Sequence, residues 1–498
     1  MPSTSRERLS RVVRTIAAHP AFAAVLVVGT TVRVMTMFAY PPALFFGDSW
    51  DYIVAAFSGH PVAISANRPS VYGWLIRLFT LPSRDFVQLV AVQHLAGLIT
   101  GTLIYLVLVR ARVPRTAAAA AAALVILDGY MITLEQYVMA EAFFTLTIVT
   151  AAVLLVWPAV ARDGSAGTPR TRTLAVAGLL LGVAALQRES ALFALPAFAI
   201  YLLWTRVGLR GLAAFLLALA LPVVAYAARF DERYGTFSLS HTSGWTLYGR
   251  VAGFADCAGA GVAPAARGLC ETAAQRHSHP DAPTWYIFDS ASSAVKMFGV
   301  YGDASRPGVD ANGIVGAFAH RIIIHQPLAY LDAVASDVLR YFTPGATPYA
   351  DSASATSLPV RASAETIVPD VRSKYLPTVS PRVRSPAAAV RAYRSIVHVP
   401  RPVIALLALA SLLGLVVRIP SRREVLLLSG SGLSMIVGVA ATAGFGIRYL
   451  LPAVPLLALG GTLATREMGV LLRARPGSAA ALRAARRWLP SRARTELG

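Results

Sequence analysis

Residues 87–109, VQLVAVQHLAGLITGTLIYLVLV, form an apolar run that is long enough to cross a bilayer as one helix. A basic cluster, Arg110, Arg112 and Arg115, follows it directly. Working outward from this run, similar apolar stretches occur on both sides, and short arginine clusters bound them too. The pattern predicts an all-α, polytopic membrane protein.

The composition supports the same fold class. Hydrophobic residues make up 56% of the 498-residue chain and charged residues only 14%, with a mean hydropathy of +0.57. Soluble domains carry about 25% charged residues. The formal charge of +21 does not indicate nucleic-acid binding, because much of the arginine excess lies at the ends of apolar runs and in the C-terminal tail. In those places arginine sets topology and binds anionic headgroups.

The apolar runs predict about ten transmembrane helices. They lie near residues 20–39, 87–109, 116–133, 139–157, 173–186, 190–205, 211–228, 402–417, 425–443 and 449–465. Four arginines between Arg6 and Arg14 precede the first run, which is expected to be an uncleaved signal anchor with a cytoplasmic N-terminus.

With ten spans and a cytoplasmic N-terminus, four loops and the C-terminal tail also lie in the cytoplasm, and all five are basic. They contain Arg110/Arg112/Arg115, Arg162/Arg170/Arg172, Arg206/Arg210, Arg418/Arg422/Arg423 and the arginine-rich tail from Arg466. The agreement predicts a multi-pass plasma-membrane protein with both termini in the cytoplasm and its remaining loops external.

This topology divides the chain into four parts. Residues 1–228 form an N-terminal transmembrane module that includes a long first external loop, 40–86. Residues 229–401 form an external insertion, 402–466 the last transmembrane helices, and 467–498 a basic cytoplasmic tail.

The insertion is expected to be α/β or irregular. Residues 311–342 have helical periodicity, which Pro327 breaks or kinks. The only two cysteines, Cys257 and Cys270, both lie in the insertion, and an oxidising compartment favours a disulfide between them.

The first external loop carries a carboxylate pair within Phe46-Gly47-Asp48-Ser49-Trp50-Asp51-Tyr52. Apolar residues at helical spacing predict a short surface helix from Asp48 to Gly59 and a second one that begins at Pro69. Helix capping by Asp48, with Asp51 completing a capping box, is one explanation of the pair.

Other ionisable residues fall at the same predicted external rim, and this favours a second explanation. They are Arg33, Arg68, Glu135, Glu141, Arg188, Glu189 and Arg448. Charges at membrane depth are costly and are usually paired or functional. A carboxylate can take a proton from an acceptor hydroxyl, and arginines can hold a lipid phosphate. The set therefore indicates a site for a lipid-phosphate-linked substrate.

These motifs, in this order, resemble the GT-C superfamily of polytopic glycosyltransferases, which use polyprenyl-phosphate sugars. The resemblance rests on Gly47–Tyr52, Arg68–Tyr72, Leu134–Glu141 and the Arg448–Pro452 stretch, and covers residues 20–230 and 400–466 best. Ser243–Arg250 is similar to actinobacterial members. Two departures are the separation of Asp48 from Asp51 and the place of the insertion, between the seventh and eighth spans.

The resemblance implies an inverting glycosyltransferase of the cell envelope that moves a sugar, arabinose or mannose by analogy, to a hydroxyl of a glycan, lipid or protein. Its catalytic residues would be Asp48 as general base, Asp51 and Glu141. Its substrate-binding residues would be Arg448, Arg188 and Arg68 for the phosphate, with Glu135, Glu189, Tyr52 and Tyr72. For the two tyrosines, anchoring in the headgroup region is the simpler interpretation.

Three further points stay open at this stage. The carboxylates would allow a divalent metal, although no ligand spacing requires one. The alternative functions are a lipid-linked glycan ligase or polymerase, a lipid or sugar transporter, and a structural membrane protein. Membrane lipids are expected partners in every case.

Overall fold

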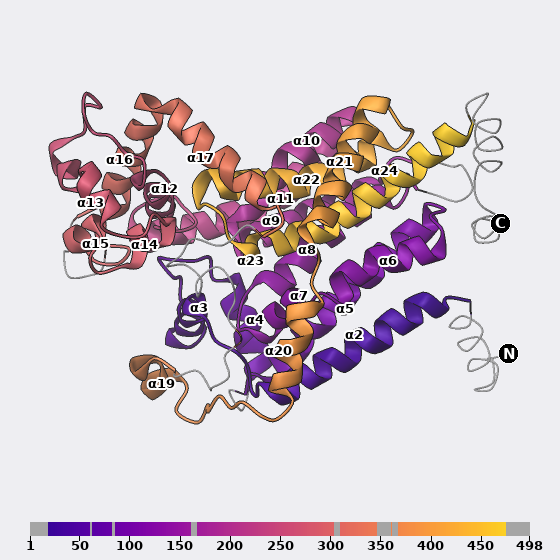
Figure 1. The fold of residues 1–498 in the computed structure, drawn as a ribbon, viewed down its shortest axis with the longest axis horizontal. Helices are drawn as coiled ribbons and strands as arrows, with labels where there is room; N and C mark the ends of the chain where they lie inside the picture. The colour runs from indigo at the N-terminus through magenta and orange to yellow at the C-terminus, as the bar shows by residue number, and fades with distance from the viewer. Residues whose placement is uncertain are drawn as a thin grey trace.

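The computed structural model describes residues 18–59, 62–81, 85–160, 167–302, 309–345, 360 and 367–474. Helices dominate this part of the chain, and its one β-type pairing is an isolated bridge between Leu44 and Tyr137. A bundle of long helices carries a cluster of short helices at one end, and the described chain begins and ends at the other, where α2 starts and α24 finishes (Figure 1). The predicted all-α polytopic fold is confirmed.

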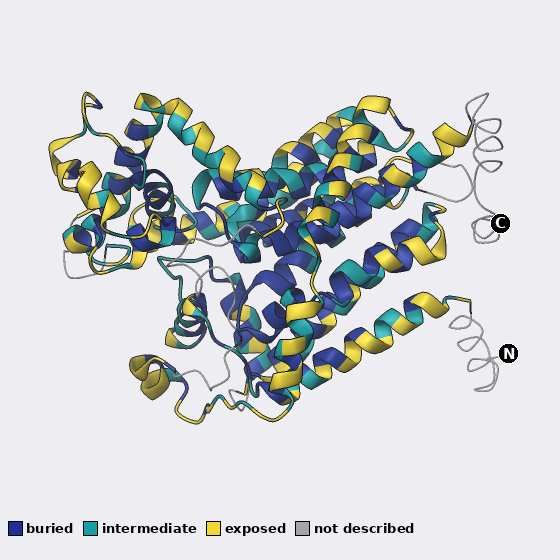
Figure 2. Ribbon diagram, in the orientation of Figure 1, coloured by how far each residue is buried: buried dark blue, intermediate teal, exposed yellow. Residues whose placement is uncertain are grey.

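Five helical segments are long and apolar enough to cross a membrane. They are α2 (Pro20–Ala39), α5 (Val87–Arg110), α11 (Leu209–Tyr234), α22 (Arg422–Thr442) and the segment Ile447–Arg473, which contains α23 (Ile447–Leu450), η3 (Leu451–Ala453) and most of α24 (Val454–Ala474). Their outward faces are exposed and their inward faces buried, as expected for helices surrounded by lipid (Figure 2).

Two bent helix pairs and three shorter apolar helices account for the other predicted spans. The pairs are α6 (Arg115–Ile126) with α7 (Gly129–Gln136), and α20 (Ala387–Ile396) with α21 (Arg401–Val417); the shorter helices are α8 (Glu141–Val156), α9 (Thr171–Gln187) and η1–α10 (Glu189–Trp204). Counting each bent pair as one span gives up to seven, so the total of ten stays a prediction.

Asp128 explains the bend between α6 and α7. Its carboxylate accepts hydrogen bonds from the backbone N–H groups of Met131 at 2.7 Å and Val399 at 2.6 Å. The first bond caps a new helix, and the second ties that helix to the chain before α21. The pair therefore bends by 44° within what the sequence presents as one apolar run.

Two short helices, α3 (Gly47–Ser58) and α4 (Val71–Thr80), occupy the first predicted external loop. Gly59 ends α3 as predicted, but the capping explanation for the two aspartates is wrong. Phe46 is the N-cap residue and exchanges hydrogen bonds with Ser49, while Asp48 lies inside the first turn. The N-cap of α4 is Ser70, so Pro69 precedes that helix rather than starting it.

The insertion forms helices where an α/β or irregular unit was expected, and its described residues contain no strand. The helices of the insertion include α12 (Ser243–Ala252), η2 (Pro264–Leu269), α13 (Ala273–His277), α14 (Pro283–Phe288), α15 (Ser293–Phe298), α16 (Ala311–His325), α17 (Pro327–Arg340) and α19 (Pro369–Tyr375). Aromatic residues such as Trp245, Tyr248 and Phe318 fill a core of its own. The predicted break at Pro327 separates α16 from α17.

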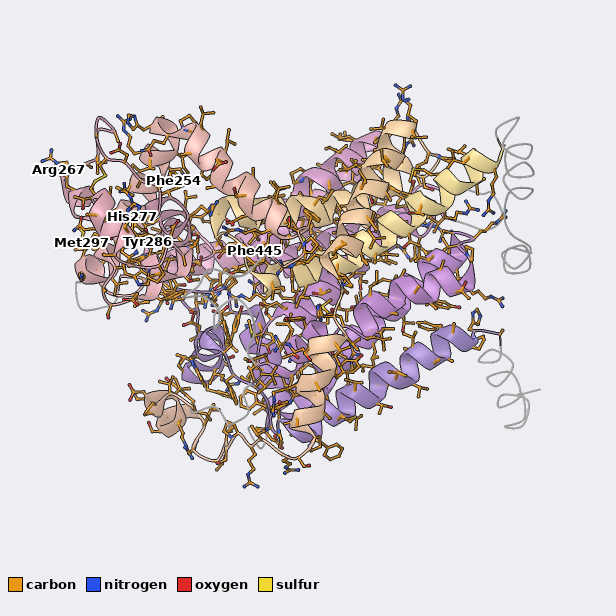
Figure 3. The ribbon with its side chains drawn as sticks, viewed as in Figure 1. Phe254, Arg267, His277, Tyr286, Met297 and Phe445 are labelled. Atoms are coloured by element: carbon orange, nitrogen blue, oxygen red, sulfur yellow. A yellow bond between two sulfur atoms is a disulfide. The ribbon has the colours of Figure 1, made fainter. Side chains whose placement is uncertain are left out.

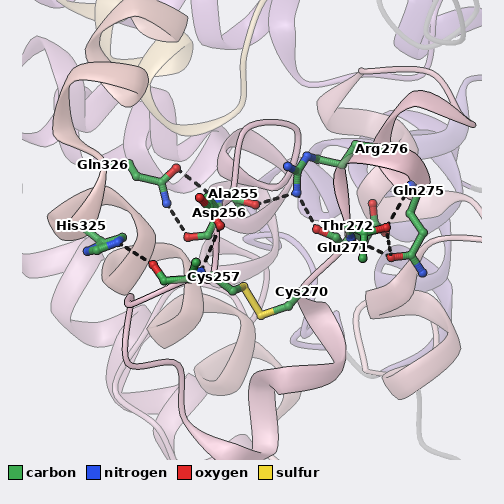
Figure 4. The surroundings of a disulfide bond; sticks show 11 residues. Ala255, Asp256, Cys257, Cys270, Glu271, Thr272, Gln275, Arg276, His325 and Gln326 are labelled. Atoms are coloured by element: carbon green, nitrogen blue, oxygen red, sulfur yellow. Dashed lines mark hydrogen bonds between the residues drawn. A yellow bond between two sulfur atoms is a disulfide. The ribbon is translucent and has the colours of Figure 1, made fainter.

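A disulfide joins Cys257 to Cys270 across the loop before η2 (Figure 4). A buried ion pair between Arg250 and Asp337, at 2.8 Å, fixes the insertion to the bundle, because Asp337 also accepts from the backbone N–H of Phe445. Figure 3 shows Phe445 where the two parts meet. The arginines from Arg6 to Arg14, Arg162 and the tail beyond residue 474 lie outside the described residues.

Helices α9 and α11 pack with almost no space between their backbones. A Cβ atom on Gly178 would lie 2.2 Å from the Phe215 carbonyl oxygen, and one on Gly182 would lie 2.5 Å from that of Leu219. Small residues four positions apart allow this approach in membrane helices. The short span α9 thus gains its stability from contact with a longer neighbour.

Replacing Gly178 by alanine is expected to push α9 from α11 and to destabilise the protein by about 1–3 kcal/mol, the usual cost of overpacking. The melting midpoint in detergent should fall by several degrees. Gly469→Ala is the matched control, because a methyl group there meets nothing within 4 Å. Equal melting of both variants and the wild type would contradict this packing.

Candidate active site

The carboxylate of Asp48 lies between two guanidinium groups that come from opposite ends of the sequence. One oxygen accepts a hydrogen bond from Arg68 Nη2 at 2.6 Å, and the other accepts from Arg448 Nη1 at 2.6 Å. Asp48 is 6% exposed. Both bonds are charge-assisted and sheltered from water, which makes them stronger than surface ion pairs.

Asp51 lies one helical turn after Asp48 and shares one of its arginines. Its carboxylate is 3.3 Å from Arg68 Nε and accepts from the side-chain amide of Asn67 at 3.2 Å. Arg68 therefore bridges the two aspartates. The two-residue separation that departs from the superfamily pattern still brings both carboxylates to the same guanidinium.

Glu141, the first residue of α8, extends the cluster. It accepts a short hydrogen bond from Arg188 at the end of α9, and one of its oxygens is 3.9 Å from Arg448 Nη1. Its other oxygen, Oε2, is buried and has no hydrogen-bond partner among the described residues. A buried carboxylate oxygen without a partner is a candidate for binding a substrate hydroxyl.

Each charged residue is held by an element that ends at the same side of the bundle. The first turn of α3 supplies Asp48, the start of α8 supplies Glu141, and the start of α23 supplies Arg448. Arg188 leaves α9 in extended backbone conformation. The charged side chains project from helix ends into one cluster. The apolar faces of the spans therefore remain available for packing and for contact with lipid.

Tyr449, which the sequence analysis did not select, lies beside two of the arginines. Its ring centroid is 4.9 Å from the Arg448 guanidinium and 5.6 Å from that of Arg188, and its hydroxyl accepts from Arg448 Nη2 at 3.0 Å. Cation–π contacts of this kind fix the orientation of guanidinium groups. Its position directly after Arg448 in the late motif was the available signal.

A cavity of about 690 Å³ opens beside this cluster, between the bundle and the insertion. Its wall includes Tyr52, Arg68, Arg188, Glu189 and Tyr449, and the insertion adds Thr242, Ser243, Thr246, Asn312 and His320. Asp48, Glu141 and Arg448 lie behind that wall. The insertion therefore completes the cavity. Ser243 and Thr246 belong to the segment Ser243–Arg250, whose role the sequence did not reveal.

Two residues predicted to bind substrate have other surroundings. Glu135 forms a bidentate ion pair with Arg33 at 2.8 and 2.9 Å and lies 2.8 Å from His94 Nδ1, in a buried network that joins α2, α5 and α7. Tyr72 is fully buried and donates to Gln93 Oε1 at 2.6 Å. Neither residue lines the cavity, and Tyr72 is not a headgroup anchor. Tyr52 is also buried, but it reaches the cavity wall.

Burial and the arginines act in opposite directions on Asp48. Burial alone would raise its pKa, but the positive charges of Arg448, Arg68 and Arg188 outweigh that effect and hold the pKa of Asp48 below its ordinary value. For Asp51, burial outweighs the attraction of Arg68, so its pKa is raised. Burial also raises the pKa of Tyr52 to about 12, which keeps its hydroxyl neutral.

A metal ion would need several oxygen, nitrogen or sulfur ligands directed at one point. Within the described residues, no group of three or more histidine, cysteine, aspartate or glutamate side chains has that arrangement. The carboxylates of the cluster are directed at arginines instead.

Residues 24–230 match the sequence model of the dolichyl-phosphate-mannose-protein mannosyltransferase family. No curated protein matches the chain. Among solved structures, ArnT from Cupriavidus metallidurans is similar in its apo state, with 16% identity over 90% of this chain and 78% of that chain, at a TM-score of 0.34. ArnT bound to undecaprenyl phosphate gives 15% identity over 90% and 79%, also at 0.34. These values are too low for any residue to be carried over.

The lowered pKa of Asp48 predicts how its contribution to stability changes with pH. The unfolded value is ~3.9, so the stabilisation is complete above about pH 5 and is lost as pH falls from there toward the lower folded value. The difference in melting midpoint between the wild type and Asp48→Asn should therefore be constant from pH 9 to 5 and should narrow below pH 4.

Asp51→Asn provides the control for that measurement. Because the folded pKa of Asp51 is raised, the wild type should gain stability relative to this variant as pH falls through the acid range. The same trend in both variants would show that Asp48 is not held ionised by its arginines.

Proposed function

We propose that this protein is a GT-C glycosyltransferase that transfers a sugar from a polyprenyl-phosphate donor to a hydroxyl acceptor on the external face of the membrane. The match of residues 24–230 to the dolichyl-phosphate-mannose-protein mannosyltransferase family supports the proposal. The supporting observation is the convergence of Arg68, Arg188 and Arg448 on the carboxylates of Asp48 and Glu141 beside a cavity. Guanidinium groups in this arrangement suit a phosphate whose lipid tail stays in the bilayer.

In the reaction, Asp48 takes the proton of the acceptor hydroxyl as the oxygen attacks the anomeric carbon. The bond between that carbon and the phosphate oxygen breaks, and polyprenyl phosphate leaves with one additional negative charge. A single displacement inverts the anomeric carbon. The arginines stabilise the charge that develops on the phosphate, which is the usual source of most of the rate enhancement.

The ion pairs of the cluster use three arginines and three carboxylates, so a bound phosphate must compete for them. Arg188 is the best first contact for the donor, because it lines the cavity and its described ion pair is with Glu141 alone. The sequence favoured Arg448 as the first contact for the phosphate, but this arginine lies behind the wall and donates a hydrogen bond to Asp48. Arg68 lines the cavity and is the second contact.

This competition explains how an aspartate with a lowered pKa can act as a base. A carboxylate with such a low proton affinity is a weak base, since efficient bases have pKa values nearer the working pH. When the donor phosphate takes the hydrogen bonds of Arg68, Asp48 loses part of its positive surroundings and its proton affinity rises. Donor binding thus prepares the base, and without donor the carboxylate stays paired.

Asp48→Asn is expected to lower the turnover rate by a factor of about 10²–10⁴, the range for loss of a general base. Affinity for polyprenyl phosphate should be unchanged or higher, since asparagine competes less for the arginines. The measurement is transfer of radiolabelled sugar from polyprenyl-phosphate mannose or arabinose by protein in nanodiscs, together with lipid-phosphate binding.

Full transfer activity in Asp48→Asn would show that Asp48 is not the general base. Loss of activity together with loss of phosphate binding would show that Asp48 acts on the fold of the site instead. Movement of intact donor across the bilayer without sugar release would favour a transporter.

Arg188→Gln should weaken binding of polyprenyl phosphate by about tenfold or more, because one charge-assisted contact to the phosphate is lost. Arg233→Gln is the control, since Arg233 is near the same end of the bundle but lines a different cavity. If Arg188→Gln and the wild type bind polyprenyl phosphate with equal affinity, the phosphate contact must be made by Arg68 or Arg448 instead.

A further inference from the structure

A second cavity, of about 640 Å³, lies at the far end of the bundle from α3. The end of α5, the segment after α8, the turn between α21 and α22, and α24 form its wall. In Figure 1 these helix ends point away from the cluster of short helices, toward the side where α2 begins and α24 ends. The basic loops predict this side to be cytoplasmic, so the cavity is separate from the donor site.

Arginines dominate the wall of this basic cavity. Six of them, Arg110, Arg112, Arg418, Arg422, Arg423 and Arg466, face two glutamates, Glu424 and Glu467. The Glu467 carboxylate already has partners within the protein. It accepts hydrogen bonds from the backbone N–H and the hydroxyl of Ser421, and it is 3.9 Å from Arg466. The wall therefore keeps a strong positive excess, which attracts an anion.

The backbone at two of these arginines is unusual. Arg112 and Arg418 both have a φ of 61°, in the left-handed region that ordinarily favours glycine at the end of a helix. Arg418 is the C-cap of α21, and Arg112 follows the end of α5. Arg206, which does not line the cavity, follows the end of its helix in the same region, so this conformation ends the helices without itself marking a ligand site.

Tryptophans and apolar residues mark the depth of the cavity in the membrane. The Arg110 guanidinium is 4.7 Å from the Trp157 ring centroid, and those of Arg422 and Arg423 are 5.1 and 5.9 Å from that of Trp204. Such rings lie at the headgroup level of a bilayer. Val160, Ile419 and Leu463 line the same wall, and the exposed Val416 and Val417 end α21 directly before it. Positive charge and apolar surface together suit an amphiphile rather than a soluble anion.

We propose that the basic cavity binds the phosphate headgroup of an anionic phospholipid from the leaflet at this end of the bundle, with its acyl chains beside the apolar wall. Basic pockets between transmembrane helices recognise such headgroups. The site depends neither on the donor site nor on the proposed reaction.

Topology alone does not account for this arrangement. Orientation requires positive charge in the loops of one side, but it does not require side chains from four parts of the chain to line one cavity. Arg172 and Arg210 belong to the same set of basic loops and lie outside the cavity. They provide a matched pair for an experiment.

The test compares the double variant Arg418→Gln/Arg422→Gln with the double control Arg172→Gln/Arg210→Gln. Each protein is placed in phosphatidylcholine nanodiscs, and binding of phosphatidylglycerol is measured by native mass spectrometry after titration. The cavity variant should bind phosphatidylglycerol about tenfold more weakly, because two charge-assisted contacts are lost, while the control stays near the wild type.

Equal weakening in both double variants would overturn the proposal, since general surface charge would then explain the binding. A competition on the wild type covers the case in which the cavity variant fails to fold. Glycerol phosphate without acyl chains should compete poorly. Binding of glycerol phosphate as tight as that of the lipid would overturn the phospholipid assignment and show a site for a soluble phosphate.

Discussion

The bridge from Asp48 to Arg448 joins two residues that are 400 positions apart and connects the first predicted external loop to the last membrane helix. Both partners are buried, so removing either would upset the charge balance of a buried cluster. The bridge also orders the rest of the cluster, since Arg448 approaches Glu141 and Glu141 pairs with Arg188. The positions of α3, α8, α9 and α23 relative to one another therefore depend on the charge balance at this point.

That balance sets what the site can bind. The neutral set of three arginines and three carboxylates costs less to bury than any unequal set would, because each charge has a partner. In the proposed reaction, an incoming phosphate would change this balance, and part of the binding energy would be used to separate Asp48 from Arg68. Asp51, whose raised pKa makes it the easiest of the two aspartates to protonate, can absorb part of the added negative charge. Two of the three arginines, Arg68 and Arg188, line the cavity, while Asp48, Glu141 and Arg448 lie behind its wall.

The sequence revealed the long-range parts of this design better than the local ones. Apolar length located the long helices of the bundle, because burial in lipid requires it, and the order of motifs brought Asp48, Asp51, Glu141, Arg68, Arg188 and Arg448 into one hypothesis. Local geometry was harder to predict from the sequence. The capping role of Asp48 failed because Phe46 and Ser49 form that cap, and the bend at Asp128 depends on the backbone of Val399, more than 250 residues away. Glu135 was assigned to substrate through the resemblance, and the sequence could not show its partners, Arg33 and His94, because they lie in other helices. In the insertion, only residues 311–342 showed helical periodicity, because its other helices are too short to give a clear pattern.

The helical insertion changes how the cavity is understood. With the membrane helices alone, the arginines would face a wide opening and their interactions with a phosphate would be screened by water. The insertion adds Thr242, Ser243, Asn312 and His320 to the opposite wall, and its fixed attachment through Arg250 and Asp337 keeps that wall in place. These are small hydroxyl, amide and imidazole groups, which suit the hydroxyls of a sugar rather than a charged headgroup. In the proposed reaction, the bundle presents charge to the lipid phosphate, and the insertion presents hydroxyl, amide and imidazole groups to the sugar and its acceptor. Because enclosure between the two parts lowers the local dielectric, the proposed arginine–phosphate contacts would depend on a unit that carries none of those arginines.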